Sequence, residues 1–273
     1  ASTALSPMKN VGTLLKINKA KKMFIKFHIA DGVATLAFDR PDKKNAITRA
    51  MYQSLADGLT SAANDKSVRT IVITGEGGIF TAGNDVEEFL QYPPQPGDSH
   101  VTLFMNTLRD AEKPVIASVS GMAIGIGTTL LMHCDLVYAA ENARFAMPFT
   151  QLGLCPEFAS SYLFPRLAGY QRAAEKLLLG EAFMADEAAQ MGLVSKVMPA
   201  DALSSFVAAQ AAKLVALPAE SLRITKQLMK KDRAAGVDAA MQDELQHFIR
   251  LLQGPDAKEA FSAFLEKRKP VFS

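Results

Sequence analysis

Short β-rich runs alternate with helical patterns through the first half of this chain, and this alternation restricts the fold more than any other feature of the sequence. Two runs at 24–29 and 33–39 flank Ala30-Asp31-Gly32, a turn tripeptide typical of a hairpin. Apolar strands are expected at 69–74, 115–119 and 136–140, with helices at 48–63, 101–111 and 127–133. Strands that alternate with helices favour an α/β fold with parallel strands and right-handed crossovers.

From about residue 160 the pattern becomes mostly helical. One strand is expected at 193–198, and helices are expected at 200–216, 219–234, 238–252 and 255–267. The last helix has an apolar face made of Ala257, Ala260, Phe261, Phe264 and Leu265. We therefore divide the chain into an N-terminal tail at 1–22, expected to be disordered, a core at 23–200 and a helical region at 201–273. Such C-terminal helices cover the core, a partner subunit or both.

The net charge of +2 is unevenly distributed along the chain. Residues 1–26 contain six lysines and no acidic residue, which leaves 24 basic and 28 acidic residues in the remainder. A body with this balance is not expected to bind nucleic acid. The Lys-rich lead is also compatible with a transit peptide, whereas Pro270-Val271-Phe272-Ser273 does not resemble a peroxisomal Ser-Lys-Leu signal. We expect a cytoplasmic location.

Neither the cysteines nor the histidines form a pattern typical of metal binding. Cys134 and Cys155 are too few for a disulfide framework and are wrongly spaced for structural zinc, and the four histidines are scattered. The uncharged run at 115–134 is long enough to cross a membrane, but it contains three glycines, and Pro114 precedes it. We interpret this run as a buried strand, turn and helix, and expect neither a metal site nor a membrane span.

Two glycine-rich strand-to-helix junctions are the candidate functional segments. They are Phe80-Thr81-Ala82-Gly83-Asn84-Asp85 and Gly121-Met122-Ala123-Ile124-Gly125-Ile126-Gly127-Thr128-Thr129. Glycine lets the backbone turn sharply and approach a ligand, and N–H groups near a helix start are free to face negative charge. Side by side, the two junctions would form an oxyanion hole, although each alone is more often a plain turn. The chain lacks GxxxxGK[ST], GxSxG and HExxH, which argues against nucleotide hydrolysis, serine hydrolysis and zinc proteolysis.

With three further segments, these junctions resemble the crotonase (enoyl-CoA hydratase/isomerase) superfamily. The further segments are Phe38-Asp39-Arg40-Pro41 to Asn45-Ala46, His133-Cys134-Asp135-Leu136 and Phe264-Leu265-Glu266-Lys267-Arg268-Lys269. The resemblance extends from about residue 23 to 272 in the expected order and spacing. It implies a spiral of ββα turns over 23–200, C-terminal helices that assemble a homotrimer or hexamer, and an acyl-CoA thioester as substrate.

The resemblance also implies which residues bind the substrate. Two backbone N–H groups hold the thioester oxygen in this family, and the matching positions are Asn84 and Ile126. Backbone donors do not depend on side-chain identity, and losing one such donor typically costs about 10²–10³ in rate. The loop of Ala82, Gly83, Asn84, Asp85 and Val86 matches the segment that packs against coenzyme A. Lys267 matches a lysine near the coenzyme A 3′-phosphate, often from another subunit, although a solvated helix end explains it equally well.

The acid and base positions distinguish the reactions of this family. Hydratases use two glutamates, and the matching positions here hold Thr129 and Phe149, which cannot transfer a proton at neutral pH. Peroxisomal-type Δ3,Δ2-enoyl-CoA isomerases use one glutamate, which Glu157 matches. Glu157 is the only Asp or Glu within 144–162, and its neighbours are apolar or small. A surface or helix-start carboxylate is the structural alternative.

One carboxylate is sufficient for moving a double bond from C3=C4 to C2=C3. The base removes a proton at C2, the oxyanion hole stabilises the dienolate, and the same base returns a proton at C4. We therefore expect a Δ3,Δ2-enoyl-CoA isomerase of fatty-acid β-oxidation that needs no cofactor, since coenzyme A is part of its substrate. Apolar surroundings would raise the pKa of Glu157.

Three alternatives remain. One is a hydratase with displaced acid and base groups, and another is an acyl-CoA thioester hydrolase. The third is a non-catalytic crotonase homologue that acts as a scaffold or binds RNA through the Lys-rich tail.

Overall fold

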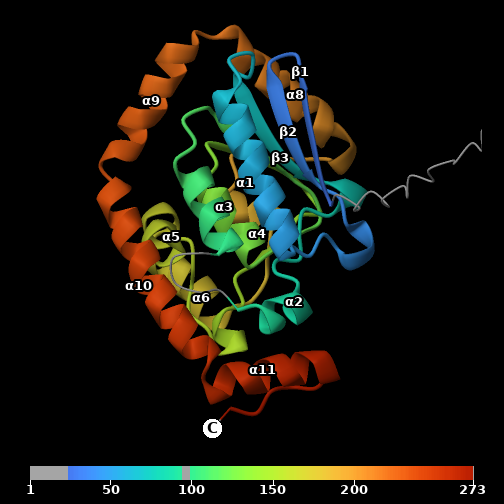
Figure 1. The fold of residues 1–273 in the computed structure, drawn as a ribbon, viewed down its shortest axis with the longest axis vertical. Coiled ribbons are helices and arrows are strands. Elements are labelled where there is room, and N and C mark those ends of the chain that lie inside the picture. The colour runs from blue at the N-terminus through green and yellow to red at the C-terminus, as the bar shows by residue number, and fades with distance from the viewer. Residues whose placement is uncertain (1–23, 94–98, 273) are drawn as a thin grey trace, which may run out of the picture.

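The computed structural model describes residues 24–93 and 99–272. The tail expected at 1–22 therefore lies outside the described residues. Sheets near the centre are flanked by helices, and a long helical arm runs down one side to the C-terminus (Figure 1).

A six-stranded sheet in the order β1-β2-β3-β4-β6-β9 organises the fold. Its strands are β1 (Ile25–Ala30), β2 (Val33–Phe38), β3 (Thr70–Gly75), β4 (Val115–Val119), β6 (Leu136–Ala140) and β9 (Lys196–Met198). β1 and β2 pair antiparallel, as the turn tripeptide between them predicts. The pairs from β2 to β9 are all parallel, which confirms the α/β fold expected from the sequence.

A second, three-stranded sheet in the order β5-β7-β8 was not expected from the sequence. Its strands are β5 (Met122–Ile124), β7 (Arg144–Ala146) and β8 (Phe183–Met184). Segments of two or three residues are too short to show an alternating pattern, so periodicity cannot detect them. An isolated parallel bridge between Thr81 and Ala123 extends this sheet to the first glycine-rich junction. Successive turns of the chain thus add strands to both sheets, which produces the ββα spiral.

Within the described residues of the core, seven α-helices flank the two sheets. They are α1 (Arg49–Asn64), α2 (Val86–Gln91), α3 (His100–Arg109), α4 (Ile126–Thr129), α5 (Ser160–Ala168), α6 (Tyr170–Leu179) and α7 (Ala185–Gln190). Thr48 is the N-cap of α1, because its side chain accepts a hydrogen bond from the Met51 N–H. The helix expected at 127–133 is instead the single turn α4 followed by a 3₁₀ helix, Leu130–His133.

Four C-terminal helices complete the described chain. They are α8 (Ala200–Ala216), α9 (Ala219–Lys231), α10 (Ala234–Leu252) and α11 (Pro255–Glu266). The third was expected to begin at residue 238, but it begins four residues earlier because α9 ends at Lys231. In the described part of the chain no single helix is long and apolar enough to cross a membrane, while α8 and α9 pass that test together but are bent by 106°.

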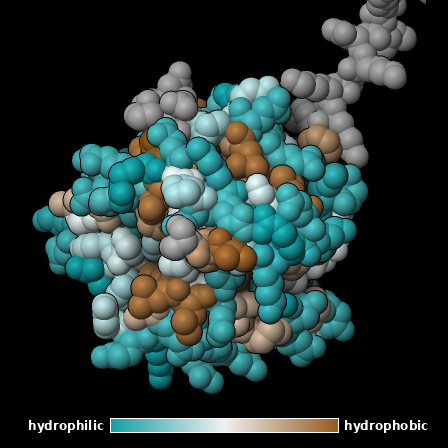
Figure 2. Space-filling model, turned by 90° about the horizontal axis from the view of Figure 1, so that it is seen from below, coloured by the Kyte–Doolittle hydropathy of each residue, from teal (hydrophilic) through white to brown (hydrophobic). Residues whose placement is uncertain are grey.

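The apolar face expected on α11 is only partly buried. Ala257, Ala260 and Phe261 are buried, but Phe264 and Leu265 remain half exposed. The first turns of α11 pack against α10 and the turn at 150–152, whereas Phe264 and Leu265 belong to its last turn. Figure 2 views the molecule from this end and shows apolar patches on a mostly hydrophilic surface.

A buried ion pair ties the helical arm to the large sheet. Lys226 of α9 donates to the Asp135 carboxylate over 2.6 Å and to the Lys113 carbonyl over 2.8 Å. The same carboxylate accepts the Val115 N–H at the start of β4. The Lys226 side chain is 5% exposed and that of Asp135 is 16% exposed, so removing Lys226 leaves the Asp135 charge largely shielded from water.

We expect Lys226→Met to lower the free energy of unfolding by about 3 kcal/mol, because it leaves the Asp135 charge without its partner. Urea unfolding at pH 7 measures this loss. Lys231→Met, at an exposed position of the same helix, is the matched control and should change the free energy of unfolding by less than about 0.5 kcal/mol. Equal losses in the two variants would contradict the role given to the pair.

Candidate active site at the two glycine-rich junctions

The two junctions lie side by side and are joined by backbone hydrogen bonds. The Thr81 N–H donates to the Met122 carbonyl over 2.8 Å, and the Ile124 N–H donates to the Thr81 carbonyl over 3.0 Å. Gly83 has a φ of +85°, and a Cβ at this position would lie 2.7 Å from the Ile124 carbonyl oxygen. Only glycine adopts this conformation without strain and leaves room for such an approach.

Both candidate oxyanion donors have N–H groups that the fold does not use. The Ile47 N–H donates to the Gly83 carbonyl and the Asp85 N–H donates to the Ile47 carbonyl, so the Asn84 N–H points away from this pairing. Ile126 is the first residue of α4, where a backbone N–H has no acceptor within the helix. Among the hydrogen bonds of the described residues, neither N–H is a donor.

The Glu157 carboxylate is bonded to the helical turn that begins with Ile126. Its Oε1 accepts a hydrogen bond of 2.5 Å from the Thr129 hydroxyl. Thr129 is the last residue of α4, and its Oγ1 lies 3.5 Å from the Ile126 carbonyl oxygen. The structure therefore brings the candidate base within one helical turn of a candidate oxyanion donor, although 31 residues separate them in sequence.

Burial raises the pKa of Glu157 from 4.5 to about 8. Loss of hydration is the main cause, because an apolar environment disfavours the charged form. The hydrogen bond from Thr129 opposes this shift, and the nearby charge of Glu244 adds to it. A carboxyl group with this pKa can both take up and release a proton near neutral pH.

A cavity of about 300 Å³ opens against the first junction. Tyr52 of α1, Asn84, Asp85, Phe89 of α2 and Val101 of α3 are among its lining residues. Ile126 and Glu157 are not among them. The structure thus places Asn84 in the lining of this cavity, whereas Ile126 and Glu157 are not part of that lining.

Comparison with known proteins establishes the family. The profile described as enoyl-CoA hydratase/isomerase matches residues 28–273. The chain belongs to this family, the crotonase superfamily. Pseudomonas aeruginosa OdaA superimposes with a TM-score of 0.87 at 42% identity, covering 89% of this chain and 99% of that one. An enoyl-CoA hydratase/isomerase from Pseudoalteromonas atlantica T6c also gives 0.87, at 36% identity and covering 92% and 100%.

Relatives in this family catalyse different reactions. Enoyl-CoA delta isomerase 2 of Rattus norvegicus is 39% identical over 219 residues, which cover 78% of this chain and 56% of that protein. The 2,3-dehydroadipyl-CoA hydratase of Escherichia coli is 35% identical over 242 residues, which cover 88% and 94%. The chain spans little more than half of the isomerase and nearly all of the hydratase. Membership of the crotonase superfamily therefore leaves the reaction to be argued from the site.

Two left-handed residues follow the candidate base. Phe158 and Ala159 have φ values of 58° and 56°, which are strained for residues other than glycine. His133 donates from Nε2 to the Phe158 carbonyl over 2.8 Å, and its ring stacks on the Phe158 ring at 3.8 Å. Burial lowers the pKa of His133 to about 3, so the ring is neutral. His133 thus has a structural role in holding the turn after Glu157.

Glu244 of α10 is a site residue that our sequence analysis missed. It is 6% exposed, and its carboxylate accepts hydrogen bonds from the Ala159 N–H and from the N–H and hydroxyl of Ser161. The detectable signal was an acidic residue on the apolar stripe of a helix, which includes Val237, Met241 and Phe248.

Tyr52 was also missed. Its hydroxyl donates to the Asn84 side-chain oxygen over 2.6 Å. Burial, together with the charge of Glu157, raises the pKa of Tyr52 well above 10. Tyr52 is therefore a neutral donor close to the candidate base. Its place among Met51 and Leu55 on the apolar face of α1 made it indistinguishable from a core residue.

The other predicted loop residues have structural partners. Asp85 forms an ion pair of 2.6 Å with Arg40 and caps α2 by accepting the Glu88 N–H. The Ala82 N–H donates to the Lys44 carbonyl, and Val86 begins α2. These contacts fix the loop to the 40–45 segment. Contact of Ala82, Gly83, Asp85 and Val86 with coenzyme A remains a prediction.

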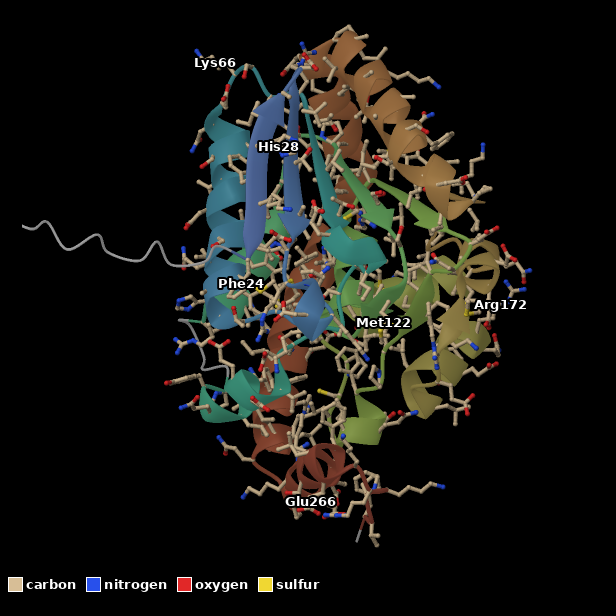
Figure 3. The ribbon with its side chains drawn as sticks, turned by 90° about the vertical axis from the view of Figure 1, so that its right-hand side faces the viewer. Phe24, His28, Lys66, Met122, Arg172 and Glu266 are labelled. Carbon is tan, nitrogen blue, oxygen red and sulfur yellow. The ribbon has the colours of Figure 1, made fainter. Side chains whose placement is uncertain are left out.

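Lys267 lies at the exposed end of α11. Figure 3 shows the neighbouring Glu266 at the lower end of the molecule, whereas Met122 of β5 lies near its middle. The ring of Phe89 in α2 lies 6.4 Å from that of Phe261, so α11 packs beside the first junction. A role of Lys267 in binding coenzyme A remains a prediction. The described residues contain no group of three or more His, Cys, Asp or Glu able to hold a metal ion.

We expect the Glu157 carboxyl to make folding depend on pH. Its folded-state pKa of about 8 lies above the ordinary 4.5, so its stabilising contribution is complete below pH 4.5 and is lost as the pH rises toward 8. Glu157→Gln should therefore have a higher melting temperature than the wild type at pH 9. The difference should be about 2–4 °C for each 1 kcal/mol of unfolding free energy that the charged Glu157 costs the wild type.

Thermal unfolding of both proteins at pH 5 and pH 9 tests this expectation. Glu141→Gln removes an exposed carboxylate and is the control. If the melting temperatures of Glu157→Gln and the wild type differ by the same amount at both pH values, the charge of Glu157 does not destabilise the folded protein.

Proposed function

We propose that this crotonase is a Δ3,Δ2-enoyl-CoA isomerase that converts 3-enoyl-CoA to 2-trans-enoyl-CoA. The hydrogen bond between Thr129 and Glu157 is the observation that supports this proposal most directly. It fixes a carboxyl group of raised pKa beside the helical turn whose first N–H is free. A base for the acyl chain and a donor for the thioester oxygen therefore lie together.

In the proposed mechanism Glu157 moves the proton while the backbone stabilises the charge. The Glu157 carboxylate takes a proton from C2, and the electron pair shifts onto the thioester oxygen. The N–H groups of Asn84 and Ile126 donate to that oxygen, where the negative charge of the dienolate develops. Glu157 then returns the proton to C4, which leaves the double bond between C2 and C3.

The carboxyl groups near the site favour isomerisation over hydration. Hydration by the family's usual route needs two glutamates, but Thr129 and Phe149 occupy the matching positions. A second carboxyl group, that of Glu244, lies near Glu157, but it already accepts three hydrogen bonds from the protein. Among the described residues, the Glu157 carboxyl group accepts one side-chain hydrogen bond, from Thr129, so it has more acceptor capacity left for a substrate than Glu244 has.

The remaining features of the proposed enzyme follow from the family resemblance. We propose a homotrimer or hexamer that binds its substrate through coenzyme A, with Lys267 near the 3′-phosphate. The proposed reaction requires neither a metal nor a redox cofactor, and its place is in fatty-acid β-oxidation in the cytoplasm. Binding to nucleic acid is not part of this proposal.

We expect Glu157→Gln to lower kcat for 3-hexenoyl-CoA about 10²–10⁴-fold, because glutamine keeps the size of the side chain but cannot accept a proton. Formation of the conjugated 2-enoyl thioester is followed by absorbance, and hydroxyacyl-CoA and free coenzyme A are measured in the same samples. Binding of the acyl-CoA should change little. Glu141→Gln is the matched control.

Each alternative reaction has its own product in this assay. Accumulation of hydroxyacyl-CoA would identify a hydratase, and free coenzyme A would identify a thioester hydrolase. Near wild-type isomerisation by Glu157→Gln would show that another group is the base. Salt-sensitive RNA binding that is lost on removal of residues 1–22, in a protein without turnover, would identify the non-catalytic alternative.

We expect kcat/KM of the isomerase to rise with pH to a plateau, with the midpoint of the rise at about pH 8, since only the ionised Glu157 accepts the C2 proton. Below the midpoint, kcat/KM should fall about tenfold per pH unit. Rates measured from pH 5.5 to 9.5 test this dependence. A midpoint near 4.5 would mean that Glu157 ionises as in water, contrary to its burial.

A further inference from the structure

The buried carboxylate of Glu244 holds the turn that follows the proposed base. Its Oε2 accepts the Ala159 N–H at 2.6 Å, and its Oε1 accepts the Ser161 N–H at 2.9 Å and the Ser161 hydroxyl at 2.5 Å. All three partners are donors, which matches an ionised carboxylate. Glu244 forms no ion pair within the described residues. These three hydrogen bonds therefore replace the hydration that its carboxylate loses on burial.

These hydrogen bonds replace a missing helix cap. Ala159 is the N-cap residue of α5, and its methyl side chain cannot accept hydrogen bonds from the free N–H groups of the first turn. Glu244 supplies that acceptor from α10, 85 residues further along the chain. The negative charge also lies at the positive end of α5, where a helix dipole favours it.

The capped turn determines the direction of Glu157. Phe158 and Ala159 are both left-handed, and such strained residues persist only where the surroundings hold them. His133 holds the Phe158 carbonyl, and Ser160 donates from its hydroxyl to the Glu157 carbonyl over 2.6 Å. Glu244 holds the Ala159 and Ser161 ends of the same turn. The backbone on the C-terminal side of Glu157 is thereby fixed from a different helix.

We propose that Glu244 is a positioning residue for the isomerisation: it clamps the 157–161 turn so that the Glu157 carboxyl faces Thr129 and the Ile126 helix turn, and its charge acts on Glu157. This proposal rests on the proposed isomerase function. Glu244 is not proposed to contact the reacting atoms, because the three hydrogen bonds of its carboxylate are all to Ala159 and Ser161 of the turn.

The charge of Glu244 adds to the larger effect of burial on the pKa of Glu157. Within the described residues, Tyr52 of α1 and Cys155 of the same loop also interact electrostatically with Glu157, and His133 is bonded to the next residue, Phe158. Burial raises the pKa of Tyr52 well above 10 and that of Cys155 to about 11, and it lowers the pKa of His133 to about 3. All three are neutral at pH 8. The charge of Glu244 therefore raises the pKa of Glu157 without a competing ionised neighbour among them.

The test compares the pH dependence of isomerisation in Glu244→Gln and in the wild type. Glutamine loses the charge and places an N–H₂ group against donors, so we expect kcat to fall about 10–100-fold. KM should change less than about threefold, because the groups proposed to bind the substrate lie on other elements. The midpoint of kcat/KM should move to lower pH, since a charge that disfavours ionisation of Glu157 is gone.

Three further variants separate position from charge. Thr129→Val removes the hydrogen bond that favours ionised Glu157, so its midpoint should move to higher pH. Glu244→Asp keeps the charge but is too short to reach all three donors, so it should lower kcat with the midpoint nearly unchanged. Asp243→Asn removes an exposed carboxylate next to Glu244 on α10 and should retain the wild-type kcat within about twofold.

A wild-type kcat and midpoint in folded Glu244→Gln would overturn the proposal. The proposal would also be overturned if the activity of Glu244→Gln fell only in proportion to its unfolded fraction while the pH midpoint of kcat/KM stayed constant. That result would indicate a purely structural role. If Glu244→Gln does not fold, Ser161→Ala decides: it removes one donor, and a kcat equal to wild type would overturn the proposal. Absence of isomerisation in the wild type would instead overturn the proposed function.

Discussion

The candidate site depends on the close approach of two backbone segments at Gly83. Its position against the Ile124 carbonyl leaves no space for a side chain, and its positive φ turns the chain from the small sheet toward α2. The bridge between Thr81 and Ala123 keeps the segments in register. Because the donors proposed at Asn84 and Ile126 follow directly after these contacts, their separation is determined by main-chain geometry. Side-chain identity at 84 and 126 is then of little consequence for the oxyanion hole.

Around Glu157 the fold accepts a cost in stability. The carboxyl group loses hydration, and the buried carboxylate of Glu244 lies near it. A protein selected for stability alone would place an apolar residue or a paired charge at such a position. The cost is consistent with a group that must alternate between two protonation states, because full hydration would keep its pKa near 4.5. Functional sites are where such unfavourable environments concentrate.

Much of the fold could be predicted because local signals agree with the final structure. The alternating strands, the hairpin at 30–32 and the Thr48 cap all act within a few residues of the chain. The strands β5, β7 and β8 could not be predicted, since they are defined by pairing between distant segments and not by their own pattern. In the site, Asn84, Ile126 and Glu157 were assigned through family resemblance, and their roles remain predictions. Glu244 and Tyr52 were not, because each acts through a partner more than 30 residues away.

Glu244 also changes the interpretation of the C-terminal helices. A boundary at residue 200 separates a catalytic core from a helical region, and that division remains a prediction. Yet α10 supplies the carboxylate that caps α5, and Phe261 of α11 packs against Phe89 beside the first junction. The Lys226–Asp135 pair holds α9, which leads into α10, against the sheet. The position of the proposed base therefore depends on the last 70 or so residues of the same chain, which act as part of the site whether or not they also form a subunit interface.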